Sequence, residues 1–264
     1  MFDYHAHSHF SSDCDASMED MVKGAIDNNL KELCFTDHVD YDYQDPSIHF
    51  DIDFEAFDET FFALKEKYAH SINLKKGVEI GIQPHVIDDS SKLVKEGTFD
   101  FVICSIHTCD RLDLYRGDFY HNKTAEEVWV TYLKEAIHCA EHFNDFSVFG
   151  HLDIPKRYNE EAGNVPLKQF RPYFDQLFKV LIDKEKGIEV NTSGFKNAFK
   201  QPLPSYEIIR WYKEAGGKII TLGSDSHTPE HPGFYFKDVI KELKSIGFDS
   251  ICTFDNMKPS FQKI

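Results

Sequence analysis

The sequence lacks any uninterrupted apolar run of about 18 residues, which is roughly the length that a helix needs to cross a bilayer. Its beginning has no basic region followed by an apolar segment, so we expect a cytoplasmic protein with no membrane partner. The six cysteines form no CxxC pair, and several lie inside apolar runs. We therefore expect reduced thiols that pack as small hydrophobic groups, and no zinc held by cysteine.

Basic residues are scarce relative to acidic ones. The 29 lysines and arginines face 45 aspartates and glutamates, which gives a formal net charge of -16. This charge repels a nucleic-acid backbone, so we expect no nucleic acid as a partner. A small anionic substrate remains compatible, because clustered divalent cations reverse the local field inside a cleft. The sequence gives no indication of the oligomeric state.

No linker rich in proline, glycine or serine divides the 264 residues, and no low-complexity segment interrupts them. The composition is 41% hydrophobic and includes 24 phenylalanines and 12 tyrosines, enough to bury a large core. We therefore expect one domain that spans residues 1–264.

Short β-like runs alternate with longer amphipathic stretches of helical spacing along the whole chain. The runs are predicted at 2–5, 32–36, 73–80, 99–105, 147–151, 187–191 and 218–222, with an eighth candidate at 250–253. This alternation is typical of an α/β protein with a parallel sheet covered by helices. Seven or so units, with no GxGxxG after the first strand, favour a closed barrel over an open doubly wound sheet.

Polar motifs follow these runs at the point where each predicted strand ends. They are His5-Ala-His7, Asp37-His38, Glu79, His107, His151, Asn191 and Asp225-Ser-His227. The carboxyl ends of the strands form the face on which parallel barrels build their active sites. Imidazole and carboxylate groups hold catalytic divalent metals, so the pattern predicts one shared metal site and a metalloenzyme.

Two of these motifs are informative by themselves. In an extended strand His5 and His7 project from the same face and can bind one ion together. Glu79 interrupts a segment that looks buried, where an unpaired carboxylate costs several kcal/mol, so a cation is its natural partner. Beyond His7, Asp13 is the preferred additional ligand, and His9 stays open as a residue that supports the site or faces the substrate.

Each motif also has a structural explanation. Asp37 and His38 could cap a loop, Glu79 could pair with a lysine, and either His107 or His151 could be a satisfied core residue. The recurrence of such groups at one end of the predicted barrel favours a metal site over these separate explanations.

Taken together, the motifs resemble those of the PHP family, named for polymerase and histidinol phosphatase. The matching elements are Asp3-Tyr-His5-Ala-His7, Thr36-Asp-His38, Gly77-Val-Glu79-Ile80, Ser105-Ile-His107, Gly150-His151 and Gly223-Ser-Asp-Ser-His227. They cover nearly the whole chain. The length, the segment Glu189-Val-Asn-Thr-Ser-Gly194 and the absence of appended domains look most like the monofunctional histidinol-phosphate phosphatases of the lactococcal type.

This resemblance implies a distorted (βα)7 TIM-like barrel with three divalent metal ions at its C-terminal end. The first ion would be held by His5, His7, Glu79 and Asp225, the second by Glu79, His107 and His151, and the third by Asp13, His38 and His227. Many relatives carry histidine where this chain has Asp13, so the third site could be weaker. Zinc, iron and manganese all suit such nitrogen and oxygen ligands.

The implied activity is hydrolysis of the phosphomonoester L-histidinol phosphate, a step of histidine biosynthesis. A metal-bound hydroxide would attack phosphorus while the ions neutralise the phosphate oxygens. Asp225 and His227 are the candidate catalytic residues, with Asp225 orienting the nucleophile and accepting its proton. Arg157 and Arg116 are the candidate phosphate ligands, and a further group on one strand-end loop is expected to bind substrate: Asn191, Ser193 and Lys196.

Three other functions stay open at this point. The chain could be a PHP phosphoesterase that acts on nucleotides or other small phosphate esters, because specificity lies in loops rather than in metal ligands. It could catalyse metal-dependent amide hydrolysis or deamination on a similar barrel, although the motif set speaks against this. It could also be a regulatory module that binds metal without turnover.

Overall fold

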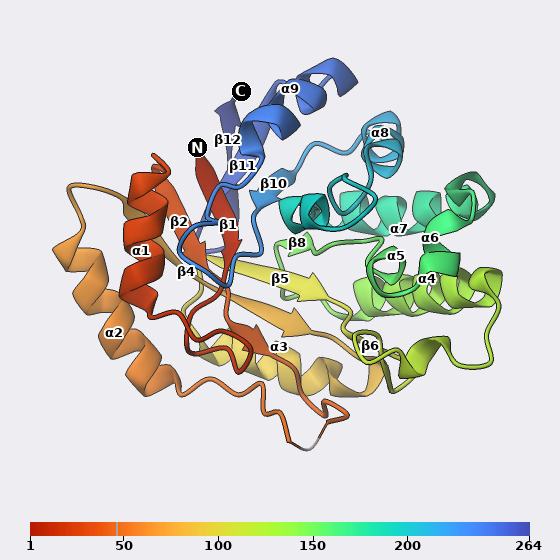
Figure 1. The fold of residues 1–264 in the computed structure, drawn as a ribbon, viewed down its shortest axis with the longest axis horizontal. Helices are drawn as coiled ribbons and strands as arrows, with labels where there is room; N and C mark the ends of the chain where they lie inside the picture. Colours follow the sequence, from red (N-terminus) through yellow and green to blue (C-terminus); the bar gives the residue numbers. More distant parts are fainter. Residues whose placement is uncertain (46) are drawn as a thin grey trace.

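The computed structural model describes residues 1–45 and 47–264, and its centre is a parallel sheet of seven strands (Figure 1). The strands pair in the order β1-β2-β4-β5-β8-β9-β10. Their bounds are β1 Phe2–Ala6, β2 Glu32–Phe35, β4 Asn73–Gly81, β5 Phe101–Ser105, β8 Val148–Phe149, β9 Gly187–Asn191 and β10 Ile220–Gly223. All six pairings along this path are parallel. The seven predicted runs therefore form the sheet.

The sheet closes on itself just beyond the ends of its first and last strands. The backbone N–H of Asp225 donates to the carbonyl of His5 at 2.8 Å, and that of His7 donates to Ser226 at 2.9 Å. A parallel bridge joins Ala6 to Ser226. The result is the distorted seven-stranded TIM-like barrel that was predicted, with closure displaced toward the C-terminal end of the strands.

Nine helices and four 3-10 turns connect the strands in the described part of the chain. The helices are α1 Met18–Asp27, α2 Phe54–Lys67, α3 Ile87–Glu96, α4 Ala125–His142, α5 Pro155–Tyr158, α6 Glu160–Asn164, α7 Arg171–Asp183, α8 Tyr206–Glu214 and α9 Phe236–Ile246. The turns are η1 Pro84–Val86, η2 Asp118–Tyr120, η3 Leu167–Phe170 and η4 Thr192–Lys196. The short strand β3 His38–Val39 pairs in parallel with β4 and adds an eighth strand to the sheet, while β6 Thr108–Cys109 and β7 Leu112–Asp113 form a separate antiparallel pair.

Local sequence explains where the helices begin. The hydroxyl of Ser17 accepts from the backbone N–H of Asp20 at 3.1 Å, which satisfies one free donor at the start of α1. At α4, Thr124 and Glu127 cap each other's backbone N–H groups in a complete capping box.

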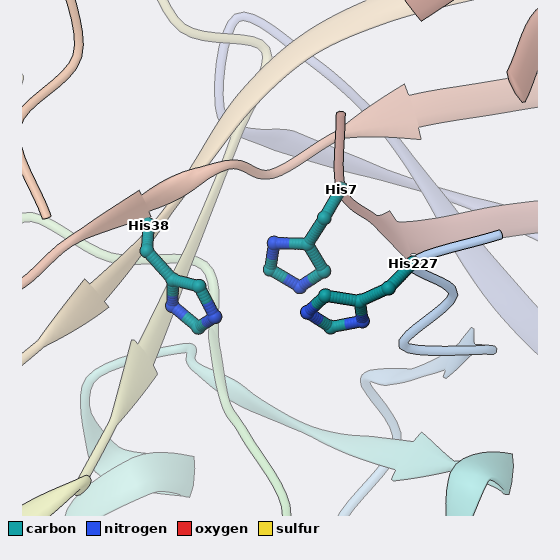
Figure 2. Close-up of side chains that lie close together, drawn as sticks. All are labelled: His7, His38 and His227. Carbon is teal, nitrogen blue, oxygen red and sulfur yellow. The ribbon is translucent and has the colours of Figure 1, made fainter. Parts of the chain in front are cut away.

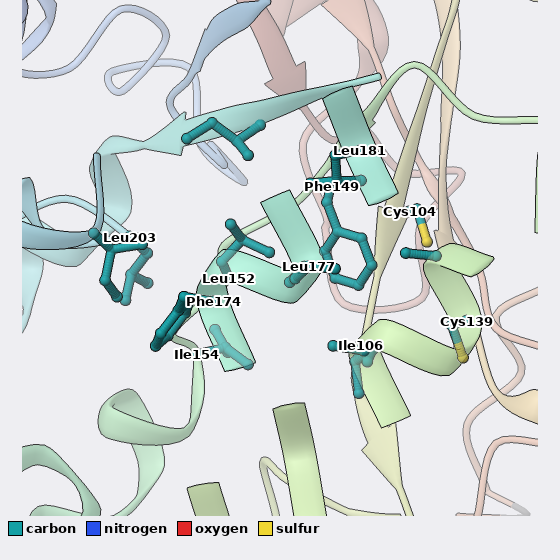
Figure 3. Close-up of a cluster of buried hydrophobic side chains, with 14 of the residues drawn as sticks. Cys104, Ile106, Cys139, Phe149, Leu152, Ile154, Phe174, Leu177, Leu181 and Leu203 are labelled. Carbon is teal, nitrogen blue, oxygen red and sulfur yellow. The ribbon is translucent and has the colours of Figure 1, made fainter. Parts of the chain in front are cut away.

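The main core packs α4 and α7 against the outside of strands β5, β8 and β9. Figure 3 shows Phe149 and Leu152 from the sheet side beside Phe174, Leu177 and Leu181 of α7. All of these side chains are fully buried. Such packing holds the strand ends, and the loops that follow them, in fixed positions.

A hairpin covers the barrel at the end opposite the strand-end loops. It is formed by β11 Ser250–Asp255 and β12 Lys258–Lys263, which pair antiparallel. The ring of Phe254 packs near Tyr4 and Phe101, and the Tyr4 hydroxyl accepts from the Phe254 backbone N–H at 2.7 Å. The eighth predicted run is thus a strand, but it belongs to this hairpin and not to the barrel.

All six cysteines are buried and free. Within the described residues, no helix is long and apolar enough to cross a membrane.

Candidate metal centre

The strand ends bring the predicted ligands together around a cavity of about 390 Å³. His5 lies on β1, Glu79 on β4 and His38 at the start of β3, while His107, His151, Asp225 and His227 follow β5, β8 and β10. The cavity wall contains Asp13, His38, Glu79, His107, His151, Asp225 and His227. His5 and His7 lie deeper and are fully buried.

Glu79 is the central group, and its two oxygens face different sets of imidazoles. Oε1 lies 3.0 Å from His151 Nε2 and 3.3 Å from His107 Nε2. Oε2 lies 2.9 Å from His5 Nε2 and 3.5 Å from His7 Nε2. The sets of imidazoles that the two oxygens face are those assigned to the first and second ion from sequence, so this carboxylate could be shared by both.

Asp225 completes the first of these sets. Its Oδ1 lies 3.5 Å from His7 Nε2 and 3.8 Å from His5 Nε2. Ligand atoms that share one zinc ion lie roughly 3.0–3.4 Å apart, because each is about 2.1 Å from the metal. The observed separations are close to this range.

Figure 2 shows a second cluster of imidazoles, formed by His7, His38 and His227. The ring of His7 stacks between those of His38 and His227, with centroid distances of 4.4 and 4.2 Å. Asp13 Oδ2 lies 3.2 Å from His227 Nε2 and 3.6 Å from His38 Nε2. The three residues assigned to the third ion are therefore neighbours, and His38 Nδ1 also lies 3.2 Å from Glu79. His9 is exposed and packs on Phe10 instead.

The site fits divalent cations on its own chemistry. Among the described residues, the buried His7 Nε2 and His38 Nδ1 have no hydrogen-bond partner, which is costly unless a cation binds there. Burial, together with the neighbouring His227 and His38, lowers the pKa of His7 to about 3, so its imidazole is neutral and able to ligate.

The buried carboxylates of Glu79 and Asp225 are ionised and need positive charge nearby. Burial alone raises the pKa of Glu79, but the surrounding His5, His38 and His107 outweigh it and hold that pKa well below its usual range. The same balance of burial against His5, His7 and Arg157 keeps the pKa of Asp225 low. Both groups are therefore anions buried among imidazoles, an arrangement that suits metal ions.

Two residues at the site have left-handed backbone conformations. His151 has a φ of 20° and Asp225 a φ of 51°, which residues other than glycine rarely adopt. The backbone N–H of Asp225 is bonded to His5, and that of His151 to a carboxylate oxygen of Glu189 at 3.1 Å. Such bonds hold strained residues in place and aim their side chains at the centre.

The candidate phosphate and substrate residues divide into two groups. Arg157 lines the cavity, lies 3.4 Å from Asp225 Oδ2 and bonds to Ser193, and its Nε has no acceptor among the described residues. Asn191 contacts Asp225, and its Nδ2 donates to Asp225 Oδ2 at 3.2 Å. By contrast, Arg116 is half-exposed and pairs with Asp45, and the exposed Lys196 lies beside His231. Of the five candidates, Arg157 alone is among the cavity-lining residues.

Several supporting residues were not predicted from sequence. Ser11 Oγ donates to Asp37 at 3.0 Å and accepts from the His38 backbone N–H, and its 3.1 Å contact with His7 Nδ1 orients that ring. Two further oxygens accept from imidazole Nδ1 atoms: those of Asp40 for His107 and Glu189 for His5, at 2.6 and 2.5 Å. Only the loops and registers of the folded barrel bring these pairs together.

A family model described as "PHP domain" matches residues 3–193. The chain belongs to the PHP family. The histidinol-phosphatase of Lactococcus lactis subsp. lactis is 31% identical over 97% of this chain and 95% of its own. A protein of Thermotoga maritima, described as a probable histidinol-phosphatase, is 30% identical over 94% of each chain.

Solved structures agree with the assignment to the PHP family. The crystal structure of the Lactococcus lactis histidinol phosphate phosphatase, complexed with zinc, L-histidinol and phosphate, has a TM-score of 0.90. It is 30% identical and the match covers 98% of both chains. A structure from Listeria monocytogenes has a TM-score of 0.79 over 90% of this PHP chain and 99% of its own, and at 16% identity it supports the fold alone.

Proposed function

We propose that this protein is a metal-dependent phosphomonoesterase that hydrolyses L-histidinol phosphate to L-histidinol and phosphate, a step of histidine biosynthesis. The observation that carries the proposal is the buried Glu79, whose two oxygens face two separate sets of histidines in one cavity. The relative from Lactococcus lactis supports the substrate, since its crystal structure holds zinc, L-histidinol and phosphate.

Three divalent ions would be held by the residues assigned above from the family resemblance. His5, His7, Glu79 and Asp225 would bind the first, Glu79, His107 and His151 the second, and Asp13, His38 and His227 the third. When bound, such ions lower the pKa of water toward neutrality and neutralise the charge of phosphate oxygens. Zinc, iron and manganese all suit this donor set.

The chain's own residues would complete the reaction. Arg157 offers a guanidinium at the cavity wall that suits the oxygens of a phosphate, with Ser193 fixing its position. Asp225 is anionic, and its Oδ1 faces the ligand cluster while Oδ2 accepts from Asn191 and Arg157. In this proposal Asp225 would orient the attacking water and take its proton, with His227 as the neighbouring catalytic candidate.

The outer part of the cavity suits a small aromatic cation. Its wall includes four aromatic side chains: Tyr43, Phe50, Tyr115 and Tyr158. Asp40 adds a carboxylate to the same wall. The imidazole and ammonium groups of L-histidinol phosphate would meet aromatic faces and negative charge there, while the phosphate reaches the metal centre.

The test is phosphate release from L-histidinol phosphate beside a panel of nucleotides and sugar phosphates, with enzyme loaded with zinc, manganese or iron. We expect a strong preference for L-histidinol phosphate that is abolished in the variants His5→Ala and Asp225→Ala. Activity on another panel member alone would discard the substrate and retain the phosphoesterase. Absence of activity in every metal form would favour a binding module.

A further inference from the structure

Glu189 is a fully buried carboxylate in the middle of β9. Its Oε1 lies 2.5 Å from Nδ1 of His5. Its Oε2 accepts from the backbone N–H of His151 at 3.1 Å and from Nδ2 of Asn191 at 3.3 Å. One side chain thus contacts residues of three different strand ends.

We infer that Glu189 is a positioning residue that sets the metal affinity of the centre. By accepting from Nδ1, it fixes His5 in the tautomer whose Nε2 lone pair points toward Glu79 and Asp225. The Nε2 atom lies 2.9 Å from Glu79 Oε2 and 3.8 Å from Asp225 Oδ1. A carboxylate in this position also raises the basicity of the imidazole toward a metal. The inference rests on the metal site of the proposed function.

Only a carboxylate satisfies all the donors that converge here. An N–H of His5, one of His151 and one of Asn191 all point at the two oxygens, and an ionised carboxyl group is an acceptor at both. A glutamine of the same shape would place its NH₂ group against one side of this set. Either the His5 bond or the bonds to His151 and Asn191 would then be lost, leaving buried donors unpaired.

The network extends to the last strand. Nδ2 of Asn191, which contacts Glu189, also lies 3.2 Å from Oδ2 of Asp225. The carboxyl ends of β1, β8, β9 and β10 are therefore joined through Glu189 and Asn191. Close packing leaves Glu189 no room to move, because a Cβ at Gly223 would lie 2.1 Å from Glu189 Oε1.

The same arrangement occurs a second time in the centre. Nδ1 of His107 lies 2.6 Å from Oδ2 of Asp40, while the other oxygen of Asp40 accepts from the Gly81 backbone N–H at 3.2 Å. One histidine from each side of Glu79 is thus oriented by a buried carboxylate. A site that presents neutral Nε2 atoms to two ions needs such a carboxylate behind a histidine on each side.

The first test compares zinc dissociation constants of the wild type, Glu189→Gln and the matched control Glu32→Gln, measured by competition with a chromophoric chelator. Glu32 is also buried and bonded, to Tyr4 and Asn73, but it lies at the start of β2, far from the strand-end loops. We expect affinity to fall about 10- to 100-fold in Glu189→Gln and to stay unchanged in Glu32→Gln. Equal zinc affinity in wild type and Glu189→Gln would overturn the inference.

The second test needs no variant and covers the case in which Glu189→Gln does not fold. Nitrogen-15 NMR of the histidine side chains in the zinc-loaded wild type reports which ring nitrogen of His5 carries the proton. A proton on Nδ1 supports the inference, and a proton on Nε2 refutes it. Both readouts are independent of turnover, so a wild type that binds zinc but does not release phosphate from L-histidinol phosphate would refute the proposed function alone.

Discussion

Gly223→Ala adds one methyl group next to the buried hydrogen bonds that Glu189 makes beside the candidate metal centre. Gly223 ends β10, and a Cβ there would lie 2.1 Å from Glu189 Oε1 and 2.5 Å from the Cβ of His5. Neither neighbour is a flexible surface group, because both are fully buried. The added methyl must therefore displace the carboxylate, the β1 strand or both.

The size of the effect can be worked out from these contacts. Ordinary van der Waals contact begins at 3.4 Å, so Glu189 Oε1 must retreat by more than 1 Å, which stretches its 2.5 Å bond to His5 beyond hydrogen-bonding distance. Losing a hydrogen bond to a charged group costs about 1.5–3 kcal/mol. Overpacking a core adds about 1–3 kcal/mol. We expect the free energy of unfolding to fall by roughly 3–5 kcal/mol.

Thermal unfolding followed by circular dichroism, with and without zinc, measures this change. For a chain of 264 residues the expected loss lowers Tm by about 5–9 °C, at about 2.1 cal/mol/K of unfolding entropy per residue. The control is Gly163→Ala in α6, where a new Cβ meets nothing closer than 3.5 Å and should shift stability by less than about 1 kcal/mol. A Gly223→Ala protein with the Tm and zinc affinity of the wild type would refute the reasoning.

Four further outcomes are expected. Chelation should abolish phosphate release and lower Tm, because each metal at 1,000 times its Kd stabilises the fold by about 4 kcal/mol. Added zinc or manganese should restore both the activity and the Tm. Activity that persists in the presence of chelator would contradict this prediction. Arg157→Ala should lower kcat/KM about 10- to 100-fold, because hydrogen bonds from a charged guanidinium are lost. Arg116, which pairs with Asp45 at the surface, is the control, and Arg116→Ala should change kcat/KM little. Equal losses of kcat/KM in the two variants would count against Arg157 as the phosphate ligand. Tyr115→Ala should raise KM for L-histidinol phosphate about 3- to 30-fold and have little effect on KM for a small aliphatic phosphate ester. The control Phe62→Ala, at an exposed position on α2, should leave both KM values unchanged. An equal rise in KM for both substrates in Tyr115→Ala would argue against recognition by the aromatic wall. Phe254→Ala in the closing hairpin should cost about 3–5 kcal/mol in urea unfolding while kcat of the folded protein is retained; a loss of kcat would show coupling to the metal centre.

Much of the fold could be predicted from the sequence, because strand and helix signals are local. The seven predicted runs, which end in polar motifs, correspond to β1, β2, β4, β5, β8, β9 and β10, and the caps at Ser17 and Thr124 begin α1 and α4. The candidate ligands were found by the same logic: they follow strands, and parallel strands end on one face. The grouping of these ligands around individual ions is a prediction from the family resemblance.

The sequence could not indicate relations that depend on long-range register. Glu189 belongs to a segment that resembles the family, yet nothing local to it indicates that its carboxylate meets His5, which lies 184 positions away. Arg116 and Arg157 look alike as loop arginines, but only the fold turns one to the cavity and the other to Asp45. The run at 250–253 reads as another barrel strand, whereas barrel closure between β1 and β10 leaves it to pair with β12.

Local sequence specifies the strands, the helix starts and the candidate metal ligands, since hydrophobic periodicity, capping and ligand chemistry act over a few residues. Tertiary structure alone decided which oxygen of Glu79 faces which histidines and which carboxylates orient their rings. Those contacts depend on positions fixed to within a few tenths of an ångström by barrel closure and core packing, and no local pattern carries that information.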